Sequence, residues 1–178
     1  TDDFYGLLYS LGKGLYDKGD YLSSRYIFEK ALEGHSEDPL LHFYLGEIAV
    51  NQGHDEKAVA YYEKAFARGE ESLKGKAAAA LVVAYNRLIH FEYYRGEEKS
   101  CEASLDQARA PILFLIEKRE SRVREASEIL AFESGYFIQK KQWERAVDAL
   151  TRLLEYEPHY PGIEELLQQA AKGLTEDD

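Results

Sequence analysis

The sequence is poor in the residues that cross-link small proteins or mark metal sites. Its 178 residues include one cysteine, one tryptophan, four prolines and no methionine. A single cysteine, Cys101, excludes an internal disulfide and does not identify the redox compartment. A chain of this length can bury a sufficient core without disulfides or metal. The sequence therefore predicts one domain, or one short array, that is stabilised by packing.

Basic residues and long apolar runs are also scarce. Lys and Arg number 22 against 33 Asp and Glu, which gives a formal net charge of −11. Because contact with phosphates requires a basic surface, nucleic acid is excluded as an expected partner. The longest apolar run covers residues 77–85, far short of the roughly 20 residues that a membrane span needs. No membrane span is expected.

The residue types of metal and catalytic sites are present but lack the required spacing. No two histidines have the helical spacing of a zinc site, and adjacent glutamates such as Glu164-Glu165 stand at expected helix starts, where they interact favourably with the helix dipole. The histidines are His35, His42, His54, His90 and His159. We therefore expect no catalytic residue, no metal and no cofactor, and the chain is predicted not to be an enzyme.

Helical periodicity runs through the whole chain. Leu7, Leu8, Leu11 and Leu15 lie on one face at helical spacing, and the polar stretch 17–20 then separates them from a second helical pattern. No segment shows strand alternation that is not also a helix pattern. The prediction is an all-α fold built from helix–turn–helix pairs.

Two stretches of the chain repeat one another with a step of 34 residues. Residues 11–32 read LGKGLYDKGDYLSSRYIFEKAL, and residues 45–66 read LGEIAVNQGHDEKAVAYYEKAF. Leu11-Gly12 recurs as Leu45-Gly46, and Gly19 recurs as Gly53. A constant step of this kind indicates a structural repeat.

This pattern resembles the tetratricopeptide repeat family, which has Leu-Gly in a first helix (helix A), Gly in the turn, and Ala, an aromatic residue and Ala in a second helix (helix B). The resemblance implies an α-solenoid, a right-handed superhelix of about four helix pairs with a C-terminal capping helix. A single array over 1–178 is expected, with repeats at about 5–38, 39–72, 72–119 and 122–158 and the capping helix at about 161–173.

The third repeat is predicted to be overlong. Ala31 and Leu153 fall in the same slot of the first and last repeats, yet they are 122 residues apart, which is 20 more than three steps of 34. Placing the surplus in the third repeat lengthens both of its helices, to about 72–95 and 98–119. Pro111 is expected to kink or break the second of them, and Gly173 is expected to end the capping helix. Cys101 falls where the family has a small packing residue.

The resemblance also implies a binding groove, because the concave wall of such arrays is formed by the A helices and holds a peptide or a helix of a partner protein. The groove positions carried over to this chain are Tyr9, Lys13, Tyr16, Phe43, Glu47, Asn51, Asn86, His90, Tyr93 and Tyr94. Their aromatic and mildly polar character suits protein recognition. The two-carboxylate clamp of chaperone-binding members is missing, since only Arg87 has the expected residue type. A basic cluster forms a candidate patch for an acidic partner: Lys118, Arg119, Arg122 and Arg124.

The sequence thus predicts a non-enzymatic scaffold or adaptor that binds a segment of another protein in the groove or along the long hairpin at 72–119. One alternative is a homo-oligomer that docks through this hairpin, where Ala77–Ala80 would allow close helix approach. A second alternative is a binder of small molecules or lipids with an aromatic cavity. The chain opens at Thr1 with neither Met nor a signal segment, which predicts a piece of a longer protein and leaves the compartment, cytoplasmic or periplasmic, undetermined.

Overall fold

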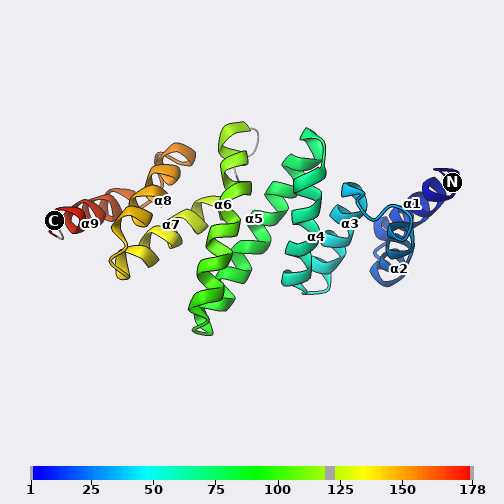
Figure 1. Cartoon of the computed structure of the whole chain (residues 1–178), viewed down its shortest axis with the longest axis horizontal. Helices are drawn as coiled ribbons and strands as arrows, with labels where there is room; N and C mark the ends of the chain where they lie inside the picture. The colour runs from blue at the N-terminus through cyan, green and yellow to red at the C-terminus, as the bar shows by residue number, and fades with distance from the viewer. Residues whose placement is uncertain (1, 119–122, 177–178) are drawn as a thin grey trace.

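The computed structural model describes residues 2–118 and 123–176, and within these it contains nine helices and no strand. The helices are α1 (Asp2–Asp17), α2 (Tyr21–Leu32), α3 (Pro39–Asn51), α4 (Asp55–Arg68), α5 (Glu71–Tyr94), α6 (Glu98–Lys118), α7 (Arg124–Gln139), α8 (Trp143–Tyr156) and α9 (Ile163–Glu176). The first eight pack as consecutive pairs, which follow one another in an elongated array with the termini at opposite ends (Figure 1). The all-α helical repeat fold is confirmed.

Two apolar cores run through the array. The smaller joins the first two pairs and is built on Phe28 and Ala31 of α2 and on Leu41, Leu45 and Ile48 of α3. The larger extends from α3 and α4 through the long pair to α9. Each pair therefore shares its core with its neighbours, which is how repeat arrays obtain stability that a single pair lacks.

The third pair is the longest, as predicted. Helix α5 has 24 residues and α6 has 21, whereas the other helices have 12 to 16. Helix α6 continues through Pro111, so the helix is not broken there. The proline removes one backbone hydrogen bond, but Ala108, Ile112 and Leu115 around it are buried in the larger core. Packing therefore holds the helix together across the proline.

In each of the first two pairs, the two helices approach each other at a glycine. A Cβ atom on Gly12 would lie 2.7 Å from Cε1 of Phe28, and one on Gly46 would lie 2.6 Å from the ring of Tyr62. Ser24 Oγ also donates a hydrogen bond of 2.7 Å to the carbonyl oxygen of Gly12. Gly12 and Ser24 are therefore small because two helices meet there.

The turn between the helices of a pair needs one residue with left-handed backbone. Gly19, Gly53 and Gly96 fill this position in the first three pairs, with φ of 78°, 74° and 73°. In the fourth pair the position is held by Lys141, with φ of 56°. A side chain is disfavoured in this conformation by roughly 1–2 kcal/mol, so the fourth turn is the strained one.

In the fourth pair, a buried ion pair involves the position that holds the leucine of Leu-Gly in the first two pairs. Glu133 stands where they have leucine, is 1% exposed, and has Oε2 3.6 Å from Nη1 of Arg152 on α8, which is 6% exposed. Arg109 of α6 approaches the other oxygen of Glu133 at 3.8 Å. Burial raises the pKa of Glu133 although both arginines oppose this. The desolvation of the carboxylate therefore outweighs its attraction to the two cations.

The capping helix differs from its prediction at the C-terminal end. Gly173 lies within α9, which continues to Glu176. A Cβ atom on Gly173 would lie 2.5 Å from the indole of Trp143. The prediction that this glycine ends the helix is wrong, because its role is to let α9 approach the tryptophan at the start of α8.

We expect Gly46→Ala to destabilise the chain by about 1–3 kcal/mol, because its methyl group overlaps the ring of Tyr62. The matched control is Gly6→Ala, whose Cβ has no neighbour within 4 Å and which should gain about 0.5–1 kcal/mol from helix propensity. Urea unfolding of both variants measures the difference. Equal stabilities would show that the glycine does not set the helix approach.

Lys141→Gly should stabilise the fourth turn by about 1 kcal/mol, since glycine adopts positive φ without strain. The converse change, Gly53→Ala, should cost about 1 kcal/mol at the corresponding turn, where its Cβ meets no neighbour. Thermal unfolding of the two variants tests the pair. A loss of stability in Lys141→Gly would contradict the assignment of strain.

Glu133→Leu should cost at most about 3 kcal/mol, because Arg152 loses its carboxylate on α7 but keeps its ion pair with Asp148, one turn earlier on α8. The double variant Glu133→Leu, Arg152→Met should recover most of this loss, since it removes both buried charges. A double-mutant cycle of unfolding free energies measures the coupling. Additive losses would mean that the two side chains do not act as a pair.

Candidate partner-binding groove

The A helices α1 and α3 bring the first set of predicted groove residues together. Tyr9 and Tyr16 of α1 pack edge-on against Tyr44 of α3, with ring centroids 6.1 Å and 5.3 Å apart. Phe43 lies 6.0 Å from the Tyr44 ring and 5.7 Å from the Tyr62 ring. All of these rings except Tyr62 are partly exposed, so α1 and α3 present an aromatic surface that we call the first aromatic cluster.

Glu47 is the polar centre of this cluster. Its Oε2 accepts a hydrogen bond of 3.2 Å from the Tyr16 hydroxyl, and its Oε1 accepts one of 2.5 Å from the Tyr62 hydroxyl. Burial and the nearby Glu47 carboxylate raise the pKa of Tyr16 to about 12, so the phenol stays a neutral donor near pH 7. The carboxylate is therefore held in a fixed position on the A-helix surface.

The remaining polar residues of this region lie at its edge. Asn51 is exposed and donates from Nδ2 to the backbone oxygen of Glu47 at 2.9 Å. Lys13 forms an ion pair of 2.8 Å with Asp17, and its ammonium lies 5.8 Å from the centre of the Tyr44 ring. The cation thus remains over the first aromatic cluster.

The A helices α5 and α7 form a second aromatic cluster. His90 lies 5.0 Å, and Tyr93 5.2 Å, from the Phe132 ring, both edge-on. Tyr93 also packs 6.1 Å from Tyr136 and 5.8 Å from Tyr94, which is 82% exposed. A hollow of about 170 Å³ lies in this cluster. It is lined by Tyr93, Ala131, Phe132, Gly135, Tyr136 and Gln139.

A hydrogen bond fixes α5 to α7 beside the second cluster. Asn86 donates from Nδ2 to Oε2 of Glu128 at 2.8 Å. Asn86 is thus engaged in joining the two helices, rather than standing free as a donor. Its neighbours on α5 supply the exposed aromatic surface.

The predicted groove residues thus fall into two groups. Those of α1 and α3 share the first aromatic cluster, and His90, Tyr93 and Tyr94 belong to the second. The predicted groove positions include no residue of the fourth pair, so Phe132 and Tyr136 of α7 were missed. Their spacing of four residues on the A helix of that repeat is the signal that could have identified them.

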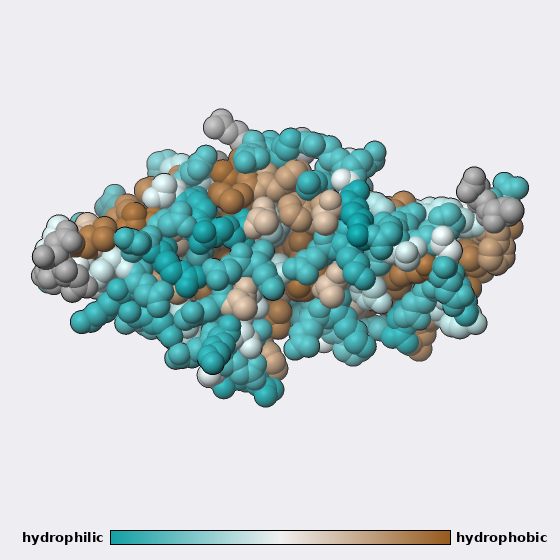
Figure 2. Space-filling model, viewed as in Figure 1, coloured by the Kyte–Doolittle hydropathy of each residue, from teal (hydrophilic) through white to brown (hydrophobic). Residues whose placement is uncertain are grey.

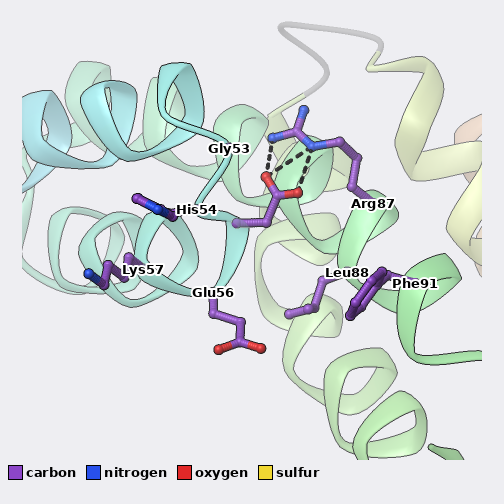
Figure 3. A pocket seen from close by; sticks show the side chains of 8 residues that line it. Gly53, His54, Glu56, Lys57, Arg87, Leu88 and Phe91 are labelled. Atoms are coloured by element: carbon purple, nitrogen blue, oxygen red, sulfur yellow. Dashed lines mark hydrogen bonds and ion pairs between the residues drawn. The ribbon is translucent and has the colours of Figure 1, made fainter. Parts of the chain in front are cut away.

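A second, larger pocket lies between α5 and the turn that joins α3 to α4. Its volume is about 480 Å³, and Figure 3 shows Leu88 and Phe91 side by side in its wall. Arg87 crosses its rim and donates to Asp55 Oδ1 from Nη2 at 2.6 Å and from Nε at 3.0 Å. The lining residues are Gly53, His54, Asp55, Glu56, Lys57, Arg87, Leu88 and Phe91. Five of these eight have polar or charged side chains, and Leu88 and Phe91 supply an apolar part of the wall.

The described members of the predicted basic patch have acidic neighbours. Lys118 forms an ion pair with Glu71 at the start of α5. Arg124 forms one of 3.1 Å with Glu128, one turn further along α7. Arg119 and Arg122 lie outside the described residues. The pairing lowers the net positive charge that the patch would offer to an acidic partner.

Side chains that could bind a metal do not converge in the described part of the chain. In residues 2–118 and 123–176 no three His, Cys, Asp or Glu side chains are placed to hold a metal ion. Cys101 is fully buried, and burial raises the pKa of its thiol to about 11, which makes it a poor nucleophile near pH 7. No helix of the described residues is long and apolar enough to cross a membrane.

Residues 9–72 match the tetratricopeptide repeat family. The crystal structure of the MamA protein is similar in fold, with a TM-score of 0.56 and 14% sequence identity over 98% of this chain and 85% of that one. No curated protein matches the sequence. The matched region contains both copies of the 34-residue repeat, and the helix pairs continue beyond it to α8. Residues 9–72 thus form tetratricopeptide repeats, and the helix pairs up to α8 extend the same helical repeat fold.

Proposed function

We propose that the chain is a non-enzymatic scaffold that binds one segment of a partner protein on the surface of its A helices. Tetratricopeptide repeats generally mediate protein–protein interactions and scaffolding. The observation that carries the proposal is the second aromatic cluster, in which Tyr93 and Tyr94 remain 40% and 82% exposed beside a hollow. Large aromatic side chains that stay exposed on a stable array are typical anchors of protein recognition.

The two aromatic clusters favour a segment that contacts several A helices. The first cluster lies on α1 and α3, the second on α5 and α7, and all four helices belong to one array. Fixed carboxylates, Glu47 in the first cluster and Glu128 beside the second, would accept hydrogen bonds from peptide N–H groups or from basic side chains. With a net charge of −11, the chain favours a partner segment that carries positive charge.

We also propose that residues 1–178 act as one binding array, with the long pair as its centre. The larger core runs through α5 and α6 and connects the pairs on either side. In the alanine stretch that suggested self-association through this pair, Ala77 and Ala78 are fully buried within the chain, whereas Ala79 and Ala80 stay partly exposed. The long pair therefore serves to hold the two aromatic clusters in one body.

A peptide library displayed on phage and selected on the purified chain tests the proposal. Selected peptides should bind at least about tenfold more weakly to Tyr94→Ala and to Tyr93→Ala, because each change removes an exposed aromatic anchor. Tyr26→Ala is the matched control, since this tyrosine is 60% exposed on α2 and lies outside both clusters. Fluorescence anisotropy of labelled peptides gives the dissociation constants.

The outcomes of this experiment separate clearly. Loss of affinity in the two α5 variants with full affinity in Tyr26→Ala supports binding at the A-helix surface. Equal affinity in all three variants, or loss only in Tyr26→Ala, contradicts it. Because Tyr94 is largely exposed, its removal should leave the circular dichroism spectrum unchanged.

A further inference from the structure

A separate hollow lies between the B helices of the first two pairs. It has a volume of about 360 Å³ and is lined by residues of α2 and α4, together with the C-terminal half of α3 and the turn that follows it. Leu45 and Ala49 of α3, which are both buried, supply an apolar part of the lining. No residue of either aromatic cluster is among the lining residues, so the hollow is distinct from the A-helix surface.

One face of α4 lines this hollow. Lys57, Ala60, Tyr61 and Lys64 are separated by steps of three, one and three residues, which places them on one side of the helix. The two lysines and Ala60 are exposed, and Tyr61 is partly exposed. Lys57 also borders the larger pocket, but Figure 3 shows its side chain extending away from Arg87. The small side chain of Ala60 leaves the face open between the two lysines.

The two lysines of this face have no anionic partner within the chain. Neither Lys57 nor Lys64 forms an ion pair or a hydrogen bond with the residues that the structure describes, 2–118 and 123–176. Lys118 and Arg124 of the predicted basic patch, by contrast, are paired with acidic residues. The ammonium groups of the α4 face are therefore available to an anion from outside the chain.

The α2 side of the hollow does not cancel this positive charge. Nε of Arg25 lies 3.8 Å from Oε1 of Glu29, which is the one carboxylate among the described lining residues, against three basic side chains of Lys and Arg. Hydrophilic residues cover most of the face of the array seen in Figure 2. The hollow thus differs from its surroundings in the sign of its charge, in a chain whose net charge is −11.

Two neutral groups in the hollow can also donate hydrogen bonds. Arg25 Nη1 donates to Oε1 of Gln52 at 3.1 Å, which leaves the amide nitrogen of Gln52 as a donor. The Tyr61 hydroxyl forms no hydrogen bond within the described part of the chain. Burial and the nearby Glu29 raise the pKa of Tyr61, so the phenol keeps its proton near pH 7. Cations and neutral donors together suit a carboxylate.

The extent of the charge favours a short acidic peptide over a nucleic acid. Lys57 and Lys64 are about two helical turns apart, or about 10.5 Å along α4, which is about the length of three residues of an extended chain. A nucleic acid needs a longer basic surface, and the 33 acidic residues of this chain repel its phosphates. Because charges are screened beyond about 8 Å at physiological salt, a short acidic segment interacts mainly with the cations nearest to it.

We propose that the hollow between α2 and α4 binds an acidic segment of a partner protein. Lys57 and Lys64 hold carboxylates that lie two to four residues apart in this segment, and Arg25 contacts the segment from α2. The site is independent of the binding proposed for the A-helix surface, because the two share no residue. One chain therefore offers two sites, which select partner segments of opposite charge.

Fluorescence anisotropy of a labelled octapeptide of alternating Glu and Ala, titrated with the purified chain, tests the proposal. This peptide should bind, more weakly as salt is added, whereas the same peptide with Gln in place of Glu should not. The double variant Lys57→Gln, Lys64→Gln should weaken binding at least about tenfold. Its matched control is Lys76→Gln, Lys99→Gln, which changes the net charge equally at two exposed lysines outside the hollow and should leave the affinity unchanged.

The possible results distinguish this site from its alternatives. Tyr94→Ala, in the second aromatic cluster, should bind the acidic peptide as the wild type does. Absence of binding up to about 1 mM, or equal losses in the two double lysine variants, overturns the proposal. Single-stranded DNA of eight nucleotides that binds more tightly than the peptide and depends on Lys57 and Lys64 overturns the choice of an acidic peptide. The circular dichroism spectrum should not change in any lysine variant, because all four lysines are exposed.

Discussion

The packing of an aromatic ring directly against a glycine determines the geometry of each of the first two helix pairs. Phe28 lies on Gly12 and Tyr62 lies on Gly46, at distances that leave no room for a methyl group. This contact sets how closely helices A and B approach, and hence where the next A helix can pack. The positions of α1, α3, α5 and α7 along the array, and of the aromatic side chains that they carry, follow from it. In the last pair and the capping helix the same principle recurs with other residues, because Gly173 of α9 receives the indole of Trp143.

Much of this architecture could be predicted from the sequence, because the determining contacts recur at a constant step. Leu-Gly, the turn glycine and the aromatic residue identify the pairs, and the 20 surplus residues identify the long pair. Roles that depend on a single tertiary neighbour could not be predicted. In the sequence alone, Gly173 suggests a helix end, because its contact with Trp143 is not visible there. Pro111 suggests a helix break, because the sequence does not show that the residues around it are buried. The partner of Glu133 is Arg152 of α8, which only the fold brings next to it.

The candidate site could also be predicted only in part. The residues of α1, α3 and α5 could be located because their repeats follow the family pattern. Phe132 and Tyr136 were missed because the fourth repeat departs from that pattern at Glu133 and Ser134, in the middle of the same helix. The exposure of Phe4, Leu7 and Leu11 could not be read from periodicity, because leucines at helical spacing look alike whether a neighbouring repeat covers them or not.

The central claim is that a partner segment binds on the A-helix surface at the second aromatic cluster. Its most direct test is nuclear magnetic resonance of the isotope-labelled chain titrated with a selected peptide. The account predicts that the largest shifts occur in the ring signals of Tyr93, Tyr94, Phe132 and Tyr136, with smaller ones extending to Tyr16 and Phe43. Shifts confined to the pocket at Gly53, Arg87 and Phe91, with the second cluster unchanged, would contradict it.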